Sequence, residues 1–503
     1  SSQVCPEIRE YDRLSTACAN AYVQPLMAGY LQRLKDGLVA QGMACPLLLM
    51  MSSGGVTTLE TAIKYPIRLV ESGPAGGAIL SRNVAAACGL TDVLSFDMGG
   101  TTAKICLIDN FQPQLSRSFE VARMYRFLKG SGLPIRIPVI DMVEIGAGGG
   151  SIARVNELQQ INVGPDSAGA QPGPACYDQG GDAPTVTDAD LTLGRIDIDL
   201  FAGGKVSLDR QKAQAALDRV IGGPLDLPTA GAAAGISEIV DENMANAARV
   251  HAIECGKDVG TRTLIAFGGA APLHASRLAE KLGIDRIVVP TGAGVGSAIG
   301  FLRAPIAYEV VRTRFMPLGE FDNVAVNGLF GDLRVEASDV VRLGAPSGDL
   351  REVRTAYMRY RGQGHEIAVD LPVRELEKSD FALMESQFAE VYRSHYGRTI
   401  PNLDVEVMSW SLSLSTIEAL PAPPTDDQVV DTARPVGERM VVDTETTEAR
   451  SVSIYLRSDL EHGSLVPGPA IIAEDETSTL VGARYDARID AHGYIVMTRK
   501  PSP

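Results

Sequence analysis

The sequence predicts an α/β fold with parallel strands, followed by a mainly β C-terminal domain. Three observations lead to this prediction. Residues 263–289 read as strand, glycine loop, helix and strand, and such a unit implies neighbouring parallel strands. Residues 93–108 read as two apolar strands around a glycine turn. From about residue 351 onward, apolar and polar residues alternate as they do in half-buried strands.

The first hundred residues predict helices and strands joined by polar loops. Apolar residues recur at helical spacing over residues 8–41, and the helix should end near Gly42. Residues 46–51 read as a buried strand, and residues 67–70 as another. A glycine-rich loop over 71–77 then leads into a helix of small residues.

The segment 93–108 holds the most informative motif, an Asp at the end of one strand and a glycine turn before the next. The turn consists of Gly99, Gly100, Thr101 and Thr102. Glycines let successive backbone N–H groups face an anion, and the two threonines add hydroxyl donors. Asp97 is placed to hold Mg²⁺ or to orient a nucleophile. The motif therefore predicts a phosphate-binding hairpin and a protein that handles ATP.

Other phosphate loops fit this segment less well. A Walker loop or a Rossmann fingerprint runs from a strand into a helix, whereas apolar and β-branched residues resume directly after Lys104. An ordinary hairpin turn with the pattern Asp-x-Gly-Gly remains the alternative interpretation of these residues alone.

The centre of the chain predicts a β-loop-α-β unit behind a long helix. Residues 111–204 read as loop-rich, and residues 236–255 form an apolar helical stripe. A strand at 263–267, a loop at Gly268 and Gly269, a helix at 272–282 and a strand at 286–289 follow. Residues 291–300 contain a GxGxxG-like pattern that we interpret as tight helix packing rather than dinucleotide binding.

Length and composition bound the class of protein. The 503 residues suffice for two to four domains, and we divide them into a core over 1–310, a connecting segment over 311–350 and a mainly β domain over 351–503. Within the last, 404–416 and 484–498 read as strands and 421–427 as a stiff linker.

Net charge and cysteine spacing limit the binding partners and the cellular compartment that we expect for this protein. The net charge of −16 opposes broad affinity for nucleic acid or an anionic membrane. The seven cysteines are scattered without CxxC spacing, which favours a reducing compartment. With no membrane-length apolar run and no leader pattern, we expect a soluble, cytoplasmic protein that is not secreted.

Nine motifs in order resemble one family. They are SSGG at 52–55, ESGPAGG at 71–77, DMGGT at 97–101, IDMVEIGAGGGSI at 140–152, GPDSAG at 164–169, PGPACY at 172–177, PTVTDA at 184–189, FGGAAPLH at 267–274 and GPAII at 468–472. Together they resemble the hydantoinase A / 5-oxoprolinase family, which includes ATP-dependent N-methylhydantoinases and is related to subunits of acetone and acetophenone carboxylases.

The resemblance implies a fold of the actin, hexokinase and Hsp70 type, in which ATP lies between two ribonuclease-H-like halves. This chain would supply the second half. On that mapping residues 97–101 are the second phosphate loop and Gly268 and Gly269 are the adenosine-side loop. The first phosphate loop does not occur in this sequence, so we expect it on a separate polypeptide or on a missing N-terminal piece. Lys104 also departs from the family, and either approaches a phosphate or points to solvent.

The resemblance also implies a reaction. ATP, with Mg²⁺ or Mn²⁺, would phosphorylate the carbonyl of a cyclic amide such as a hydantoin, N-methylhydantoin or 5-oxoproline, and a hydantoinase B-like subunit would complete ring opening in an oligomeric assembly. Two alternatives remain open. The first is that the chain is a ketone carboxylase subunit that phosphorylates an enolate. The second is that it is a non-catalytic scaffold subunit.

Two further carboxylates precede a glycine cluster. The spacing of Asp141 and Glu144 lets both face one pocket if the segment turns, so we assign them catalytic roles beside Asp97 and add Asp141 to Asp97 as a metal ligand. The alternative is that Asp141 caps a loop and Glu144 forms an ion pair. Gly148 and Gly149 suggest a close backbone approach to substrate or phosphate, although a hinge would look the same.

We expect structural rather than catalytic roles for two histidines and one cysteine. His274 lies near a helix start, where the helix dipole favours a neutral ring, and we expect it to hydrogen-bond the preceding loop. His251, on the long helix, reads as a packing or surface residue. Cys176 has no basic partner nearby in sequence and is expected to be a buried thiol.

Overall fold

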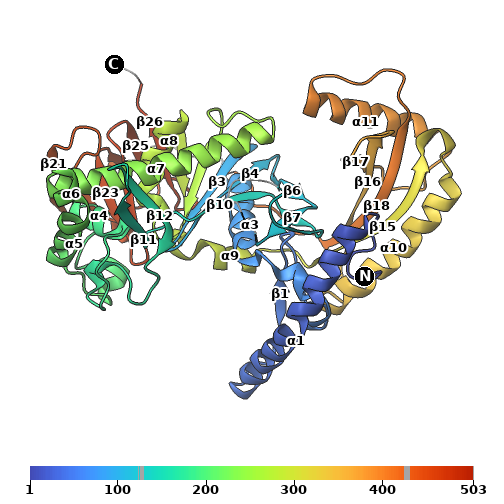
Figure 1. Ribbon diagram of the computed structural model, residues 1–503, viewed down its shortest axis with the longest axis horizontal. Coiled ribbons are helices and arrows are strands. Elements are labelled where there is room, and N and C mark those ends of the chain that lie inside the picture. The colour runs from blue at the N-terminus through green and yellow to red at the C-terminus, as the bar shows by residue number, and fades with distance from the viewer. Residues whose placement is uncertain (123, 125–129, 424–430, 502–503) are drawn as a thin grey trace. The chain divides into compact units, whose positions relative to one another are not determined.

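The computed structural model describes residues 1–122, 124, 130–423 and 431–501, so residues 424–427 of the predicted linker lie outside it. The chain forms two compact units (Figure 1). Unit 1 contains residues 1–75, 115–140 and 303–419, and unit 2 contains residues 76–114, 141–302 and 420–503. Within the described ranges, no helix combines the length and apolarity needed to cross a bilayer.

Unit 1 begins with a long helix and contains an antiparallel sheet of four strands in the order β15-β18-β16-β17. The helices are α1 (Glu10–Ala40), α2 (Leu59–Lys64), α10 (Asn323–Gly344) and α11 (Asp380–Tyr396). The sheet strands are β15 (Ala307–Pro317), β16 (Leu350–Tyr360), β17 (Ile367–Leu371) and β18 (Val405–Thr416). The aromatic side chains of Phe330, Phe388 and Trp410 are buried between this sheet and helices α10 and α11. The predicted helix at 8–41 and strand at 404–416 are confirmed.

Short strands complete unit 1. They are β1 (Leu48–Met50), β2 (Val56–Thr58), β6 (Leu115–Ser116), β7 (Phe119–Val121), β8 (Leu133–Ile135) and β9 (Val139–Ile140). The predicted strand at 46–51 corresponds to β1. The predicted strand at 67–70 is wrong, because Pro66–Leu69 is a short 3₁₀ helix, η1. Pro66 has no N–H for a strand ladder, and the Ile67 amide donates to the side chain of Asn20 over 3.3 Å.

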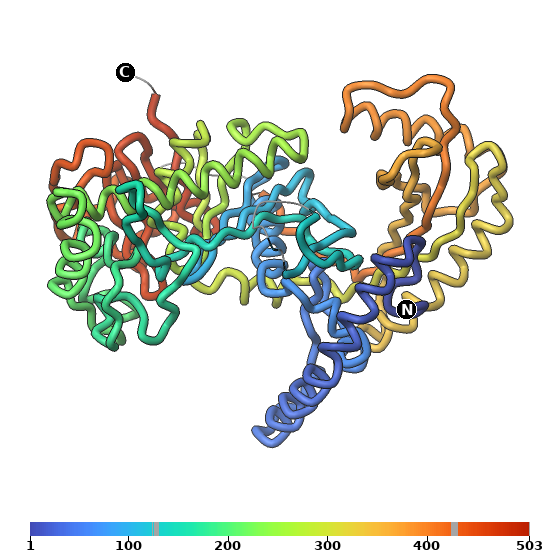
Figure 2. Tube along the Cα trace, viewed as in Figure 1, coloured from blue at the N-terminus to red at the C-terminus, as the bar shows by residue number. Residues whose placement is uncertain are grey.

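Unit 2 is built on a mixed sheet with the order β10-β4-β3-β13-β14-β26-β25-β22-β19, to which β5 adds at β4. Its strands are β3 (Asp92–Met98), β4 (Ala103–Asp109), β5 (Gln112–Pro113), β10 (Met142–Ile145), β13 (Thr263–Phe267), β14 (Arg286–Val289), β19 (Asp431–Thr432), β22 (Ser464–Pro467), β25 (Tyr485–Ile489) and β26 (Ile495–Arg499). Strands β3, β13 and β14 are parallel to one another. Figure 2 shows that this sheet combines segments from the first hundred residues with segments near the C-terminus.

Helices cover both faces of the unit 2 sheet (Figure 1). On one face α7 (Thr229–Glu254) and α8 (Ala271–Leu282) pack on β4, β10, β13 and β14. On the other face lie α3 (Ser72–Ala87) and α9 (Gly296–Leu302). A Cβ on Gly300 would lie 1.8 Å from the carbonyl oxygen of Gly76, so the small residues of 291–300 serve tight helix packing, as predicted. The β13-α8-β14 unit is also confirmed.

The segment predicted to be loop-rich, 111–204, contains more regular structure than expected. Besides short strands it holds the hairpin β11 (Ser151–Val155) and β12 (Ile161–Ser167), helix α4 (Val186–Thr192) and two 3₁₀ turns, η2 (Ala175–Tyr177) and η3 (Phe201–Gly204). Helix α5 (Arg210–Leu217) and the short helices η4 (Asp218–Gly222) and α6 (Gly223–Leu225) follow.

The C-terminal region is mostly β. A second sheet of unit 2 has the order β20-β21-β23-β24, formed by β20 (Gly437–Val442), β21 (Ala449–Leu456), β23 (Ala470–Ala473) and β24 (Ser478–Val481). Between 431 and 499 the 3₁₀ helix η7 (Arg457–Asp459) is the one non-strand element among the described residues. Two other 3₁₀ turns, η5 (Ala293–Val295) and η6 (Leu318–Glu320), lie earlier in the chain.

Candidate functional site

The predicted hairpin is present in unit 2. Strands β3 and β4 pair antiparallel, with Asp97 opposite Lys104. The turn between them, residues 99–102, is closed by a hydrogen bond of 3.2 Å from the Gly99 amide to the Thr102 carbonyl. Gly100 and Thr101 are exposed at its tip. Within the described part of the chain, the backbone amides of these two residues have no hydrogen-bond acceptor, so both can serve a ligand.

Asp97 is the next-to-last residue of β3 and is largely shielded from solvent. Ser297 Oγ donates to Asp97 Oδ2 over 3.1 Å. Burial raises the pKa of the Asp97 carboxyl above its usual value, while the nearby Lys104 opposes this shift and Glu144 adds to it. A cation beside this carboxylate would favour its ionised form.

Three charged side chains lie in a row across neighbouring strands. Lys104 on β4 is in register with Asp97 on β3 and with Glu144 on β10. Lys104 Nζ lies 3.5 Å from Glu144 Oε1 and donates to Thr102 Oγ1 over 2.7 Å. The ammonium group is thus held between two carboxylates at the base of the turn, where it offsets their mutual repulsion.

The glycine loop at 148–150 packs against the turn of the hairpin. The Gly149 amide donates to the Gly99 carbonyl over 3.0 Å. The Gly150 amide donates to the Gly100 carbonyl over 2.6 Å. A Cβ on Gly148 would lie 2.6 Å from the nearest backbone nitrogen of the turn, so glycine is needed for this approach. The close backbone contact predicted from this cluster is made with the hairpin itself.

Thr187, which we did not single out from the sequence, fixes the glycine loop from the other side. Its amide and its Oγ1 donate to the Gly149 carbonyl over 2.7 and 2.8 Å. Thr187 lies in the first turn of α4, where Thr185 and Asp188 form a reciprocal capping box. The resemblance motif at 184–189 therefore positions the loop that supports the hairpin.

Gly268 lies beside Asp97, and the assignment of Gly268 and Gly269 as the adenosine-side loop stays a prediction. Phe267 at the end of β13 is in register with Asp97 in the neighbouring parallel strand. Gly268 has a φ of +99°, and a Cβ there would lie 2.7 Å from Asp97 Oδ1 and 2.4 Å from the Met98 carbonyl oxygen. Only glycine fits this conformation and this space.

A hollow of about 350 Å³ opens next to Gly269. Its larger apolar side chains come from Ile196, Leu200, Phe201 and Leu273, and its polar side chains from Asp197, Lys205 and residues 474–478. Thr477 Oγ1 donates to the Gly269 carbonyl over 3.0 Å, which ties the two walls together. No sequence motif marks this hollow, because its walls come from three distant segments.

Glu474 is the titratable group of the hollow with the largest shift. Burial, opposed by Arg457 and reinforced by Glu476 and Asp475, raises the pKa of Glu474 to about 7. Its carboxyl group thus changes charge near neutral pH, in the hollow that Gly269 also lines.

The structure does not bring Asp141 and Glu144 into one pocket. Glu144 lies on the strand β10 and faces Lys104, whereas Asp141 precedes that strand by one residue. Side chains alternate between the two faces of a strand, so a separation of three places these two on opposite sides. Asp141 instead joins His251 and Cys255 of helix α7 and its C-cap, with one donor atom from each within 4.8 Å of the others. The catalytic and metal-binding roles assigned to these carboxylates stay predictions.

His274 differs from its prediction. Its ring nitrogens lie 2.8 Å from Asp241 Oδ1 and 3.1 Å from Asp190 Oδ2, and the side chain is fully buried. Burial favours the neutral ring, but the two carboxylates outweigh it and raise the pKa of His274 to about 10. The prediction of a neutral ring is wrong, because partners from α4 and α7 dominate over the helix dipole. Cys176 is a buried thiol, as expected.

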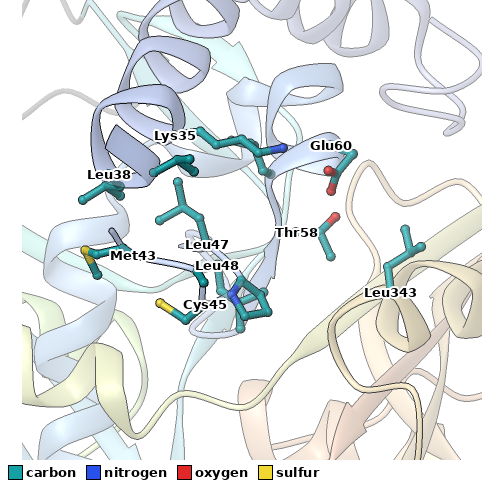
Figure 3. Close-up of a pocket in the computed structure, with 13 residues that line it drawn as sticks. Lys35, Leu38, Met43, Cys45, Leu47, Leu48, Thr58, Glu60 and Leu343 are labelled. Atoms are coloured by element: carbon teal, nitrogen blue, oxygen red, sulfur yellow. The ribbon is translucent and has the colours of Figure 1, made fainter. Parts of the chain in front are cut away.

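Unit 1 contains a separate hollow of about 390 Å³ (Figure 3). It lies at the end of α1 and is lined mainly by apolar side chains, with Lys35 and Glu60 as its charged residues. It contains none of the predicted site residues.

Comparison with known proteins places this geometry in a family. Residues 13–310 match the family described as Hydantoinase/oxoprolinase, and residues 325–499 match its C-terminal domain. The chain belongs to the hydantoinase/oxoprolinase family. The resemblance stated from the sequence motifs is confirmed.

Relatives of this hydantoinase/oxoprolinase chain include subunits of two kinds of enzyme. It is 33% identical over 497 residues to the caprolactamase subunit alpha of Pseudomonas jessenii, covering 97% of this chain and 70% of the relative. It is 30% identical over 529 residues to the acetophenone carboxylase gamma subunit of Aromatoleum aromaticum, covering 99% and 68%. The crystal structure of the ATP-dependent caprolactamase from Pseudomonas jessenii is similar with a TM-score of 0.83 at 30% identity, over 99% of this chain and 72% of that one.

Proposed function

We propose that this chain is the ATP-binding subunit of an enzyme that hydrolyses a cyclic amide at the expense of ATP. The observation that carries the proposal is the hairpin of β3 and β4, whose exposed turn amides lie next to a shielded Asp97 and, on the adjacent parallel strand, to Gly268. This arrangement suits ATP binding of the kind that actin and hexokinase use. Unit 2 would form one ribonuclease-H-like half of the ATP cleft. The other half, with its own phosphate loop, belongs to a further segment or chain.

The hairpin turn is the proposed seat of the terminal phosphates. The amides of Gly100 and Thr101 lack acceptors within the described residues, and both threonine hydroxyls of the turn add donors. Lys104 supplies a positive charge beside Thr102. Gly148 and Gly149, whose amides donate within the protein, hold the turn in place rather than donating to the nucleotide.

Asp97 would hold Mg²⁺ or Mn²⁺. Its carboxylate is shielded and has a raised pKa, so a bound divalent cation would relieve the cost of its ionisation. Such an ion, when bound, neutralises charge on the phosphates during transfer. Ser297 keeps the carboxylate oriented through its hydrogen bond.

We assign the nucleoside to the hollow beside Gly269. Its apolar side chains, Phe201 among them, offer a face for a base, and its size lies in the range of small-ligand pockets. A base in this hollow would direct the phosphates toward Asp97. Gly269 lines the hollow, and the residue before it, Gly268, lies against Asp97.

The chemistry follows from the substrate. An amide carbonyl is a poor electrophile because the nitrogen lone pair donates into it. When the amide oxygen attacks the γ-phosphorus, the bond from that phosphorus to the bridging oxygen breaks, ADP leaves, and the carbon becomes open to attack by water. Water adds to that carbon, the C–N bond breaks as the ring nitrogen takes up a proton and leaves, and a second water hydrolyses the resulting acyl phosphate to a carboxylate and inorganic phosphate. Such transfer depends on positioning and charge neutralisation, which the hairpin, Lys104 and Asp97 supply.

A second subunit, hydantoinase B-like, would complete ring opening. The relatives that are named as subunits support an assembly of this kind. Glu144 remains the proposed proton-handling carboxylate on the Asp97 side of the sheet.

A cytoplasmic setting is supported by the cysteines, since none of the seven, all within the described residues, forms a disulfide.

The test measures ADP release by the assembly with caprolactam, 5-oxoproline, hydantoin, or acetophenone with bicarbonate. We expect a lactam or hydantoin to stimulate ADP release in the parent. Asp97→Asn should lower the rate by about 10²-fold or more, because it removes the charge at the phosphate site. Asp92→Asn, an exposed position on the same strand, is the matched control. Equal rates for Asp97→Asn and the parent would contradict the assignment, and stimulation by the ketone alone would redirect it to carboxylation.

A further inference from the structure

Three side chains of types that can ligate a metal meet where α7 packs on β10. They are Asp141, just before β10, and His251 and Cys255, at the end of α7. One donor atom from each lies within 4.8 Å of the other two. His251 is buried, while the other two are partly exposed, so solvent can deliver an ion.

We propose that Asp141, His251 and Cys255 bind a divalent transition metal of the zinc type. A thiolate, an imidazole and a carboxylate form a donor set that suits zinc or cobalt and does not suit Mg²⁺, which prefers oxygen ligands alone. The site is therefore distinct from the proposed Mg²⁺ position at Asp97, and the proposal does not depend on the proposed function.

The helix sets the spacing of two ligands. The Cys255 amide donates to the His251 carbonyl over 3.1 Å, so the two side chains lie one turn apart on the same face of α7. The C-terminal end of a helix carries partial negative charge, which favours a cation there. Asp141 approaches from the position just before β10 and supplies negative charge for a divalent ion.

The distances fit a tetrahedral centre after small adjustments. Ligand atoms around zinc lie about 3.3 to 3.8 Å from one another, given metal–ligand bonds of about 2.0 to 2.3 Å. The donor atoms lie within 4.8 Å of one another, so they must draw together by about 1 Å when an ion binds. Three protein ligands leave a fourth position for water.

Convergence on one point distinguishes this cluster from a Cys–His–Asp catalytic relay. In a relay the nucleophile and the carboxylate lie on opposite sides of the imidazole, so they are remote from each other. Here the carboxylate oxygen and the sulfur themselves lie within 4.8 Å of each other. A shared ion accounts for that geometry.

The ion would join α7 to the start of β10. That strand pairs with β4 of the hairpin and carries Glu144, which faces Lys104. Metal binding would therefore stabilise the outer strand on which the hairpin rests.

The experiment uses the full chain, stripped with a chelator and titrated with Co²⁺. We expect one equivalent to bind tightly, with a thiolate-to-cobalt charge-transfer band in the near ultraviolet and d–d bands of tetrahedral intensity. Bound Co²⁺ or Zn²⁺ should also raise the Tm by mass action. Cys255→Ser should abolish the charge-transfer band, and His251→Gln should weaken binding by at least ~10-fold.

Cys18→Ser is the matched control, because Cys18 is an exposed cysteine on α1. It should bind Co²⁺ as the parent does. Circular dichroism of each metal-free variant checks the fold. A parent that binds no equivalent of Co²⁺, or a folded Cys255→Ser variant with an unchanged charge-transfer band, would overturn the proposal without bearing on ATP hydrolysis.

Discussion

Ser297 donates a hydrogen bond of 3.1 Å to the carboxylate of Asp97, although the two residues are 200 positions apart in the sequence. Ser297 is the second residue of α9, a helix whose glycines allow it to pack closely on α3 and on the end of β13. The small residues of this helix therefore place a hydroxyl donor at the centre of the proposed phosphate site.

Ser297→Ala should move the acid limb of the pH–rate profile to higher pH. The hydrogen bond from Ser297 favours the ionised carboxylate of Asp97. Burial already raises the pKa of Asp97, and losing the hydrogen bond should raise it further. We expect a displacement of about one pH unit, with little change of the rate on the alkaline side. Ser297→Thr keeps the hydroxyl and should restore the parent profile. An unshifted acid limb in Ser297→Ala would show that the hydroxyl has no influence on Asp97.

Gly148→Ala should disable the hairpin without changing any charged group. The added Cβ would lie 2.6 Å from the backbone of the turn, which must then shift. We expect nucleotide-dependent activity to fall by about 10²-fold, because sub-ångström placement of phosphate donors decides the rate. Gly319→Ala is the matched control, since a Cβ there meets nothing within 4 Å. Full activity in Gly148→Ala would mean that the contact between loop and turn is dispensable.

Local patterns predicted those parts of the site that are continuous in the chain. The hairpin around Asp97 follows from strand patterning and a glycine turn, and β13-α8-β14 follows from alternating periodicities. Both are confirmed, as is the family. Gly268 lies near Asp97 in the structure because neighbouring parallel strands end at the same edge of a sheet.

Features that depend on distant partners could not be predicted. Thr187 and Ser297 lie in segments that the sequence marks, at 184–189 and 291–300, but their contacts with the site depend on tertiary packing. The ionisation of His274 is set by Asp190, 84 positions away, and Asp241, 33 positions away, so a local helix-dipole argument gave the wrong state. Asp141 and Glu144 seemed to share a pocket because the sequence does not show where the strand β10 begins.

His274→Gln should destabilise unit 2 strongly. The ring bridges two buried carboxylates, and Arg195 Nη1 donates to Asp190 over 2.9 Å, so the cluster is neutral only when His274 is charged. Removing that charge leaves one buried carboxylate charge of this cluster without compensation and should cost about 3–5 kcal/mol. His462→Gln, at an exposed position, is the control. Urea unfolding of both variants measures the effect, and equal midpoints would contradict it.

The same histidine predicts how stability depends on pH. The pKa of His274 is about 10 in the fold against an ordinary value of 6.5. Its contribution is therefore complete below pH 6.5 and is lost as the pH rises toward 10. The free energy of unfolding of the parent should fall over this interval relative to His274→Gln. A constant difference between the two from pH 6.5 to 10 would show that the ring does not titrate there.

Glu474→Gln should stabilise the fold above neutral pH. The pKa of Glu474 is about 7 in the fold and near 4.5 when unfolded, so the folded chain holds this proton more firmly. Stability linked to Glu474 is complete below pH 4.5, declines as the unfolded chain loses the proton, and is gone above about pH 7. At pH 8 the uncharged variant should exceed the parent by about 1–3 kcal/mol, and at pH 4 the two should match. Glu461→Gln, an exposed substitution of the same kind, should track the parent at both values. Thermal unfolding at pH 4, 6 and 8 tests this, and a variant no more stable than the parent at pH 8 would place the Glu474 carboxylate in a well-solvated environment.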